Sequence, residues 1–177
     1  MKAEAPINKP ALRSLLRKRR KALALAHPDA PTLAAAKLPI ELLRPFTIVA
    51  GYQPMGSELD PGPLLQRFAD FGATIVLPVA TSSDQPLVFQ HADGQAYAAP
   101  DIVIAPLFAF DRNGGRLGQG GGHYDRTLEG LRARSPVFVI GLAFAGQQID
   151  AVPREPHDQW LDAILTEISY TSVRKDI

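Results

Sequence analysis

The chain has 177 residues, of which 46% are hydrophobic and 21% are charged, an ordinary balance for one globular domain with a substantial core. Its formal net charge of +1 gives no global field that would favour a nucleic acid or a membrane surface as a partner. The absence of cysteine excludes disulfides, thiolate catalysis and cysteine zinc sites, and no apolar stretch approaches the length of a membrane span.

The first predicted helix concentrates positive charge near the start of the chain. Asn8 is a suitable N-cap, Pro10 fits the first turn, and His27-Pro28 ends the helix. The apolar face is predicted to hold Leu12, Leu15, Leu16 and Leu23. A neighbouring stripe carries Lys9, Arg13, Arg17, Arg20 and Lys21. This stripe is either a contact for phosphate or another polyanion, or a solvated basic face, which is the commoner meaning of a charge run.

The rest of the chain alternates between apolar strand patterns and helical patterns. Helices are predicted over residues 32–43 with a break at Pro39, over 60–71 and over 124–133. Strands are predicted over residues 46–50, 74–79, 87–89, 102–108, 137–142 and 164–168. This alternation predicts an α/β fold, a single three-layer αβα domain over residues 1–177 with a mostly parallel sheet. Because ligands bind beyond the carboxyl ends of such strands, the segments after residues 50 and 108 should reach one cleft.

A glycine-rich run over residues 110–126 is the most informative part of the sequence. Glycine backbone approaches ligands closely, and its N–H groups, with the start of a following helix, form a cradle for phosphate. Arg116 and Arg126 add cations, while Asp111 and Asp125 add hard oxygen ligands suited to Mg²⁺. The run is neither a Walker loop nor a dinucleotide fingerprint. From the residues alone, it is either a metal–nucleotide site or a flexible turn.

Four segments in order resemble the 5-formyltetrahydrofolate cyclo-ligase family, also called the 5,10-methenyltetrahydrofolate synthetases. The central one is Arg116-Leu117-Gly118-x-Gly120-Gly121-Gly122-x-Tyr124-Asp125-Arg126. The others are Lys9-x-x-Leu12-Arg13, the segment from Tyr52 to Glu58, and Pro153-Arg154-Glu155-Pro156-His157-Asp158. Together they span nearly the whole chain.

The resemblance implies an ATP-dependent ligase of one-carbon metabolism. The expected reaction converts 5-formyltetrahydrofolate, ATP and Mg²⁺ into 5,10-methenyltetrahydrofolate, ADP and phosphate. We expect a cytoplasmic monomer whose partners are ATP and the folate, with no nucleic-acid or membrane partner.

The resemblance also implies residue roles. ATP would be bound by Lys9, Arg13, Arg116, Leu117, Gly118, Gln119, Gly120, Gly121, Gly122, His123 and Tyr124. The folate would be bound by Gln53, Glu58 and residues 119–123, the last shared with ATP. Arg116 and Tyr124 would be catalytic, and Asp125 and Asp158 would hold the metal.

Several residues also have a plainer structural interpretation. Glu58 either accepts hydrogen bonds from the pterin or supplies favourable charge before a helix. For Arg17 to Lys21 we favour the solvated basic face. Asp111 is expected to be a turn residue and Trp160 a core residue, while His157 is either a ligand or simply oriented by Asp158.

The sequence departs from the family pattern at Gln119 and His123, where aromatic residues are usual, and between Phe89 and Pro100, where a longer excursion is usual. Three alternatives therefore stay open. They are a nucleotide-dependent relative acting on another formyl or carboxyl substrate, a nucleotide- or folate-binding protein without turnover, and nucleic-acid binding through residues 17–21. ATP binding without phosphate release would favour the second, and salt-dependent retention of RNA the third.

Overall fold

The structure is a computed structural model that describes residues 8–79, 82, 85–91, 93–94 and 96–173. A seven-stranded sheet with the order β3-β2-β1-β4-β7-β8-β9 forms its centre. Its strands are β1 (Ile48–Ala50), β2 (Thr74–Val79), β3 (Val88–His91), β4 (Ile102–Ala105), β7 (Phe138–Leu142), β8 (Ala163–Leu165) and β9 (Tyr170–Ser172). The inner strands from β2 to β8 are parallel, and the edge strands β3 and β9 are antiparallel to their neighbours. The predicted mostly parallel α/β sheet is confirmed.

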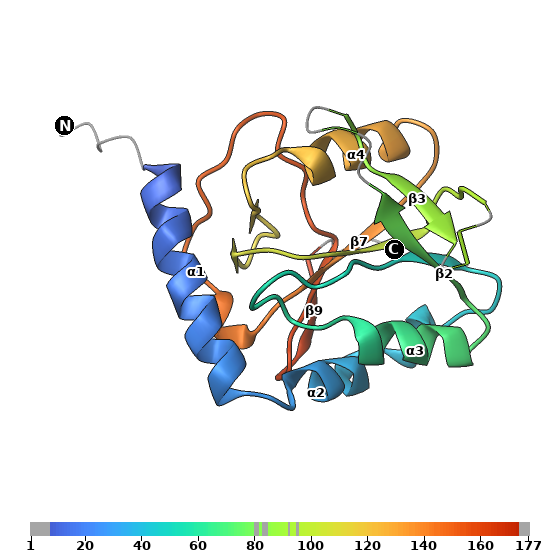
Figure 1. The fold of residues 1–177 in the computed structure, drawn as a ribbon, viewed down its shortest axis with the longest axis horizontal. Helices are drawn as coiled ribbons and strands as arrows, with labels where there is room; N and C mark the ends of the chain where they lie inside the picture. The colour runs from blue at the N-terminus through green and yellow to red at the C-terminus, as the bar shows by residue number, and fades with distance from the viewer. Residues whose placement is uncertain (1–7, 80–81, 83–84, 92, 95, 174–177) are drawn as a thin grey trace.

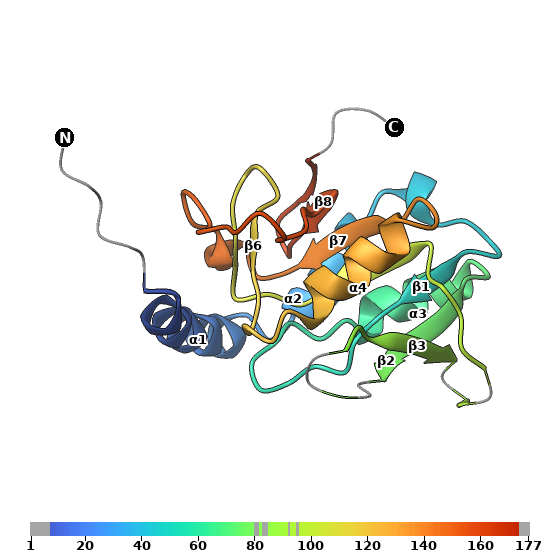
Figure 2. The same ribbon diagram turned by 90° about the horizontal axis from the view of Figure 1, so that it is seen from above.

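Helices cover both faces of this sheet (Figures 1 and 2). Their bounds are α1 (Lys9–Ala26), α2 (Ala30–Lys37), α3 (Gly62–Asp70) and α4 (His123–Arg132). Successive strand residues point to opposite faces, so Val49 packs with α2 and α3, whereas Ala50 packs on the side of α4. Both residues are fully buried. This double burial explains why the strands read as continuous apolar runs rather than as alternating patterns.

Helix α1 stands outside these layers. It runs beside the small hairpin of β5 (Ala109–Phe110) and β6 (Arg116–Leu117), against which Leu16 packs together with Phe108 (Figure 1). The side chain of Asn8 caps the helix by accepting a hydrogen bond from the amide of Ala11 at 3.2 Å, as the sequence predicts. Leu15 does not lie on the buried face as expected, because 64% of it is exposed.

The other differences from the predicted elements are local. Helix α2 begins at Ala30 and ends at Lys37, and a separate 3-10 turn, Ile40–Leu42, follows the break at Pro39. A second 3-10 turn spans Ala145–Gln147. Strands β5, β6 and β9 were not predicted, because they have only two or three residues. The strand predicted over residues 102–108 ends at Ala105, and β5 follows it at Ala109. None of the helices in the described ranges has the length and apolarity needed to cross a membrane.

The short connection after β3 folds back, so that Tyr97 pairs with Gln90 of β3. Gln90 and Tyr97 form an isolated antiparallel bridge, and the amide of Ala98 donates to the carbonyl of Phe89 at 3.0 Å. The described residues between Phe89 and Pro100 therefore return to the edge of the sheet within one tight turn.

The order of the strands creates a switch point between β1 and β4. From β1 the chain moves outward to β2, then returns to β4 on the other side and continues to β7 and β8. The connections beyond the carboxyl ends of β1 and β4 therefore diverge, and this leaves a crevice between them.

Candidate functional site

A cavity of about 840 Å³ lies at this switch point. Tyr52 and Gln53 line it from the end of β1, Pro106 from the end of β4, and Pro78 from β2. All the residues that the sequence analysis assigned to ATP, folate, metal or catalysis also line it: Lys9, Arg13, Gln53, Glu58, Arg116, Leu117, Gly118, Gln119, Gly120, Gly121, Gly122, His123, Tyr124, Asp125 and Asp158. The tertiary fold thus gathers four distant segments around one space.

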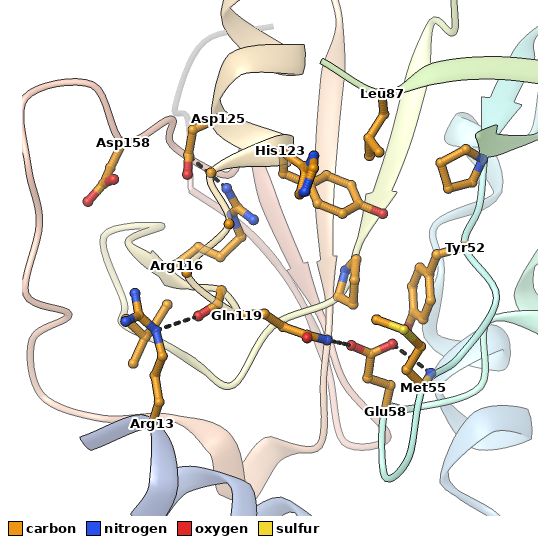
Figure 3. A pocket seen from close by; sticks show the side chains of 18 of the residues that line it. Arg13, Tyr52, Met55, Glu58, Leu87, Arg116, Gln119, His123, Asp125 and Asp158 are labelled. Carbon is orange, nitrogen blue, oxygen red and sulfur yellow. Dashed lines mark hydrogen bonds and ion pairs between the residues drawn. The ribbon is translucent and has the colours of Figure 1, made fainter. Parts of the chain in front are cut away.

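The cavity has two chemically different halves, which Figure 3 shows on either side of the glycine loop. One half contains Arg13, Arg116, Asp125 and Asp158, so it is dominated by charge. The other contains Tyr52, Met55, Glu58 and Leu87, which combine apolar surface with one carboxylate. Gln119 projects from the loop toward the second half.

The hairpin β5–β6 holds the glycine loop in place. Asp111 is buried in its turn, where Oδ1 accepts hydrogen bonds from the amides of Asn113 and Gly115, both at 2.9 Å. Its Oδ2 accepts from the amide of Val152 at 2.9 Å. Asp111 is therefore the turn residue that the sequence predicts, since these backbone donors engage both of its oxygens.

Two glycines give the loop a path that other residues would resist. Gly120 has φ +101°, and a Cβ there would lie 3.0 Å from the Arg13 guanidinium carbon. Gly122 has φ +66° and is the N-cap of α4, which begins at His123. The first turn of α4 thus presents free backbone N–H groups and its positive dipole end beside the cavity.

The charged half holds three cations in defined positions. Arg116 forms an ion pair with Asp125 at 2.7 Å, and its side chain is almost fully buried. Its Nε atom is buried with no hydrogen-bond partner among the described residues. Arg13 Nε donates to the carbonyl of Gly118 at 3.0 Å, and Lys9 Nζ donates to Glu155 Oε1 at 2.8 Å. The hydrogen bond from Lys9 lowers the pKa of Glu155.

Glu58 is the centre of the second half. It is 8% exposed, and its Oε2 accepts a hydrogen bond from the amide of Met55 at 2.9 Å. Its Oε1 accepts from Gln119 Nε2 at 2.9 Å and lies 3.7 Å from Arg20 Nη1. Glu58 precedes α3, whose N-cap is Pro61, and makes no capping hydrogen bond to it.

Two tyrosines lie beside this carboxylate. The Tyr52 hydroxyl donates to the carbonyl of Leu59, and burial followed by the charge of Glu58 raises the Tyr52 pKa well above its usual value. The Tyr124 ring lies 5.5 Å from the Arg116 guanidinium. Burial also raises the Tyr124 pKa, although Arg116 opposes this shift. Both phenols are protonated at neutral pH, so each hydroxyl has a proton available for a hydrogen bond.

Comparison with known proteins places these features in a family. Residues 88–167 match the model of the 5-formyltetrahydrofolate cyclo-ligase family. A 5-formyltetrahydrofolate cyclo-ligase from Mycolicibacterium smegmatis is 33% identical over 142 residues, covering 67% of this chain and 72% of the relative. The enzyme of that name from Escherichia coli K12 is 31% identical over 140 residues and is covered to 76%. The chain belongs to the 5-formyltetrahydrofolate cyclo-ligase family.

A solved structure agrees with this assignment. The 5,10-methenyltetrahydrofolate synthetase from Mycoplasma pneumoniae superposes with a TM-score of 0.77 and 25% sequence identity. The match covers 91% of this chain and 99% of that one. The likeness thus extends well beyond residues 88–167, the range matched by the family model.

The carboxylates that could hold a metal ion divide into two places. Glu155, His157 and Asp158 offer ligand atoms that all lie within 4.8 Å of one another. Asp125 is instead tied to Arg116 and also accepts the amide of Gln159 through the same oxygen, at 2.9 Å. Carboxylate oxygens in this charged half fit a hard cation such as Mg²⁺, which takes one or two carboxylates together with phosphate oxygens. The sequence analysis gave His157 as either a ligand or a residue oriented by Asp158, but it gave no role to Glu155, which lies in the same segment.

Arg20 corrects the prediction of a solvated basic face. It is only 4% exposed, with Nε donating to Ser57 Oγ at 3.2 Å and Nη1 donating to the carbonyl of Leu107 at 3.1 Å. The signal was present in the sequence, because residue 20 follows Leu12 and Leu16 at intervals of four and so lies on the apolar stripe. A cation on such a stripe must have buried partners.

Trp160 corrects a second prediction. It is 40% exposed rather than packed in the core, and the Arg154 guanidinium carbon stacks 3.2 Å from its ring centroid. Arg154 also donates to the carbonyl of Asp158 at 2.5 Å. The stack therefore braces the loop that carries Asp158.

Proposed function

We propose that this protein catalyses the ATP- and Mg²⁺-dependent conversion of 5-formyltetrahydrofolate into 5,10-methenyltetrahydrofolate, with release of ADP and phosphate. The observation that carries the proposal is the single cavity with two halves, one suited to phosphate and the other to a pterin, in a chain of this family. The reaction needs both substrates in contact, and the glycine loop lies between the two halves.

The charged half is proposed to bind the triphosphate of ATP. Lys9 and Arg13 would contact phosphate oxygens from α1, and Arg116 from β6. The backbone from Leu117 to Tyr124 would add N–H donors and the start of α4. The Leu117 side chain is buried in the core, so its contribution would come from the backbone. Arg116 Nε supports this assignment, because a buried donor without a partner is satisfied by a bound acceptor.

The other half is proposed to bind the folate. Glu58 would accept hydrogen bonds from pterin N–H groups, and Arg20 would hold that carboxylate in place. Gln53 is exposed at the cavity and free to contact the ring from the end of β1. Gln119 already donates to Glu58, so its side chain belongs to this half of the cavity. The backbone of residues 120–123, which follows Gln119, would contact both substrates.

Charge neutralisation and positioning account for the chemistry. A formamide oxygen is a poor leaving group, so the γ-phosphoryl group is transferred to that oxygen, and ADP is released. N10 then attacks the activated carbon and loses its proton to solvent, and the carbon–oxygen bond breaks as phosphate departs. Arg116 would stabilise charge on the transferring group, and the protonated Tyr124 hydroxyl would donate to the formyl or phosphate oxygen.

The charged half of the cavity is proposed to hold Mg²⁺ through Asp125 and Asp158. Held there, Mg²⁺ would supply positive charge that neutralises the phosphates of ATP. Within the charged half, Glu155 and His157 lie close enough to Asp158 to join it or to orient its carboxylate.

The test is the appearance of methenyltetrahydrofolate absorbance from 5-formyltetrahydrofolate on addition of ATP and Mg²⁺. We expect turnover at catalytic enzyme concentrations, with one phosphate released for each methenyl group formed. ATP binding without turnover would overturn the proposal and indicate a binding protein, or a relative with another substrate.

A further inference from the structure

Arg126 belongs to the glycine-rich run but has no part in the catalysis proposed above. It is half-buried and lies early in α4, directly after Asp125. It does not line the cavity, whereas Gly121 and Gly122 do. Arg126 is therefore placed to act on the backbone of the glycine loop and not on a ligand.

Arg126 holds two successive carbonyls of this loop. Its Nη2 donates to the carbonyl of Gly121 at 2.8 Å, and its backbone amide donates to the carbonyl of Gly122 at 3.1 Å. The guanidinium also packs closely on the loop, because a Cβ at residue 122 would lie 2.7 Å from Arg126 Nη1. Glycine at 122 thus permits the positive φ and leaves room for the Arg126 side chain.

The fixed carbonyls decide where the neighbouring amides point. A trans peptide directs its C=O and its N–H to opposite sides, and the peptide between Gly121 and Gly122 is trans. The Gly122 N–H therefore points away from Arg126, to the side of the loop that the cavity occupies. The backbone amides of residues 120–124 donate to no residue that the structure describes, so they are available to a bound anion.

We propose that Arg126 is a positioning residue for phosphoryl transfer, which keeps the Gly122 N–H aimed at the transferring phosphoryl group by holding the Gly121 carbonyl. The inference rests on the proposed function, which puts the reacting atoms where the two halves of the cavity meet, at residues 120–123. Glycine backbone rotates easily, and a donor stabilises a transition state best when its direction is already fixed. Arg126 supplies this restraint without touching either substrate.

The first test is Arg126→Ala. The Gly122 amide would remain but would lose its fixed direction. We therefore expect kcat to fall about ten- to hundredfold, less than when an oxyanion donor is removed outright. The Kd for ATP should rise about three- to tenfold, the value of one hydrogen bond. The Kd for ADP and the KM for the folate should not change, because neither involves the γ-phosphate. A merely structural role would weaken the binding of all three.

Added guanidinium separates the hydrogen bond from the charge of Arg126. In Arg126→Ala, it should restore part of kcat by occupying the vacated position, at concentrations far below those that unfold proteins. Tetramethylammonium carries the same charge without an N–H donor and should restore nothing. Equal restoration by both cations would indicate a general field effect and overturn the inference.

Arg134→Ala is the matched control, because it removes the same charge from an exposed position just beyond α4 that lines neither cavity. It should leave kcat and both nucleotide Kd values unchanged. A near-normal kcat in Arg126→Ala, or an equal loss in the control, would refute the role of Arg126.

Calorimetric binding of ATP and ADP distinguishes failure of this inference from failure of the proposed function. Absence of turnover in the unaltered protein would refute the proposed function, but the two nucleotides could still be compared. A loss of affinity in Arg126→Ala that is confined to ATP would then support the positioning of the Gly122 amide. An equal change for ATP and ADP, or no change for either, would overturn it.

Discussion

At the scale of single residues, Arg20 connects three parts of the chain that surround the half of the cavity containing Glu58. It contacts Ser57 in the loop after β1, the carbonyl of Leu107 after β4, and the carboxylate of Glu58. Because Glu58 is buried, its negative charge depends on this cation and on the donors from Met55 and Gln119. Arg20 is therefore expected to act on the folate through Glu58 as a positioning residue.

Replacing Arg20 with Met should separate this role from simple packing. The variant leaves a buried carboxylate without its cation, so we expect a loss of about 3 kcal/mol in the free energy of unfolding and a higher KM for the folate. The KM for ATP should change little. Thermal or urea unfolding and steady-state kinetics measure these effects. Adding Glu58→Gln should restore part of the stability without restoring folate affinity, and a double variant that regained normal KM would contradict the assignment.

We propose that Arg116 acts on the transferring phosphoryl group rather than on the fold. Its guanidinium lies between Asp125 and the ring of Tyr124, and one of its donors has no partner among the described residues. In Arg116→Ala we expect kcat to fall by about 10²- to 10³-fold, the range for removing one preorganised donor. Circular dichroism should show an intact fold, because the Gln159 amide still binds Asp125. Near-normal turnover in a folded variant would refute the phosphate role.

At the scale of elements, the glycine loop acts as a backbone cradle whose shape depends on positive φ angles. Arg13 lies across this loop, donating to Gly118 and packing where a Cβ of residue 120 would stand. Helix α1 and the glycine loop thus have complementary shapes where Arg13 crosses the loop. The docking of α1 on the hairpin β5–β6 through Leu16 sets the distance between them.

Gly120→Ala should disturb this match. The new Cβ would occupy a positive φ and press on Arg13, at a cost of about 1–2 kcal/mol. We therefore expect a severalfold higher KM for ATP and lower stability. Gly130→Ala is the control, because residue 130 lies in α4 with nothing within 4 Å of a Cβ. It should stabilise the protein by about 0.5–1 kcal/mol and leave the kinetics unchanged. Equal KM values for the two variants would show that Gly120 is not needed for the cradle.

At the scale of the whole molecule, the sheet was predictable because its strands are buried on both faces. Residues 74–79 and 137–142 form apolar runs, which are typical of a parallel strand that is covered on both faces. The structure places β2 and β7 there. The segments of Gln53 and Arg116 were predicted to meet because each follows a strand, whereas Lys9 and Asp158 joined them only through the resemblance to the family. All four residues line one cavity.

The remaining features depended on contacts that a sequence does not display. The hairpin β5–β6 is fixed by Asp111, whose amide partners include Val152, far along the chain. The position of Arg20 on the apolar stripe was visible in the sequence, but its buried partner, the carbonyl of Leu107, was not. The pairing of Asp125 with Arg116 likewise arises from the turn of the loop into α4.

The two-part cavity leads to a prediction about the stability of the whole domain. A ligand that binds only the folded state at about 100 times its Kd adds about 2.7 kcal/mol, which corresponds to a rise in Tm of about 5–10 °C for a domain of this size. ATP with Mg²⁺ and an unreactive folate analogue should each raise the Tm. Because they are proposed to occupy different halves, their shifts should add when both are present.

Variants from each half of the cavity test, by thermal unfolding, whether the two ligands occupy different halves. Arg13→Ala should reduce the shift caused by ATP and preserve the shift caused by the folate, since Arg13 lies in the charged half. Gln53→Ala should do the reverse, because Gln53 follows β1 on the other side of the cavity. Ligands that compete, so that their joint shift equals the larger single shift, would mean that both occupy one half. In that case phosphoryl transfer between them in this cavity would be impossible.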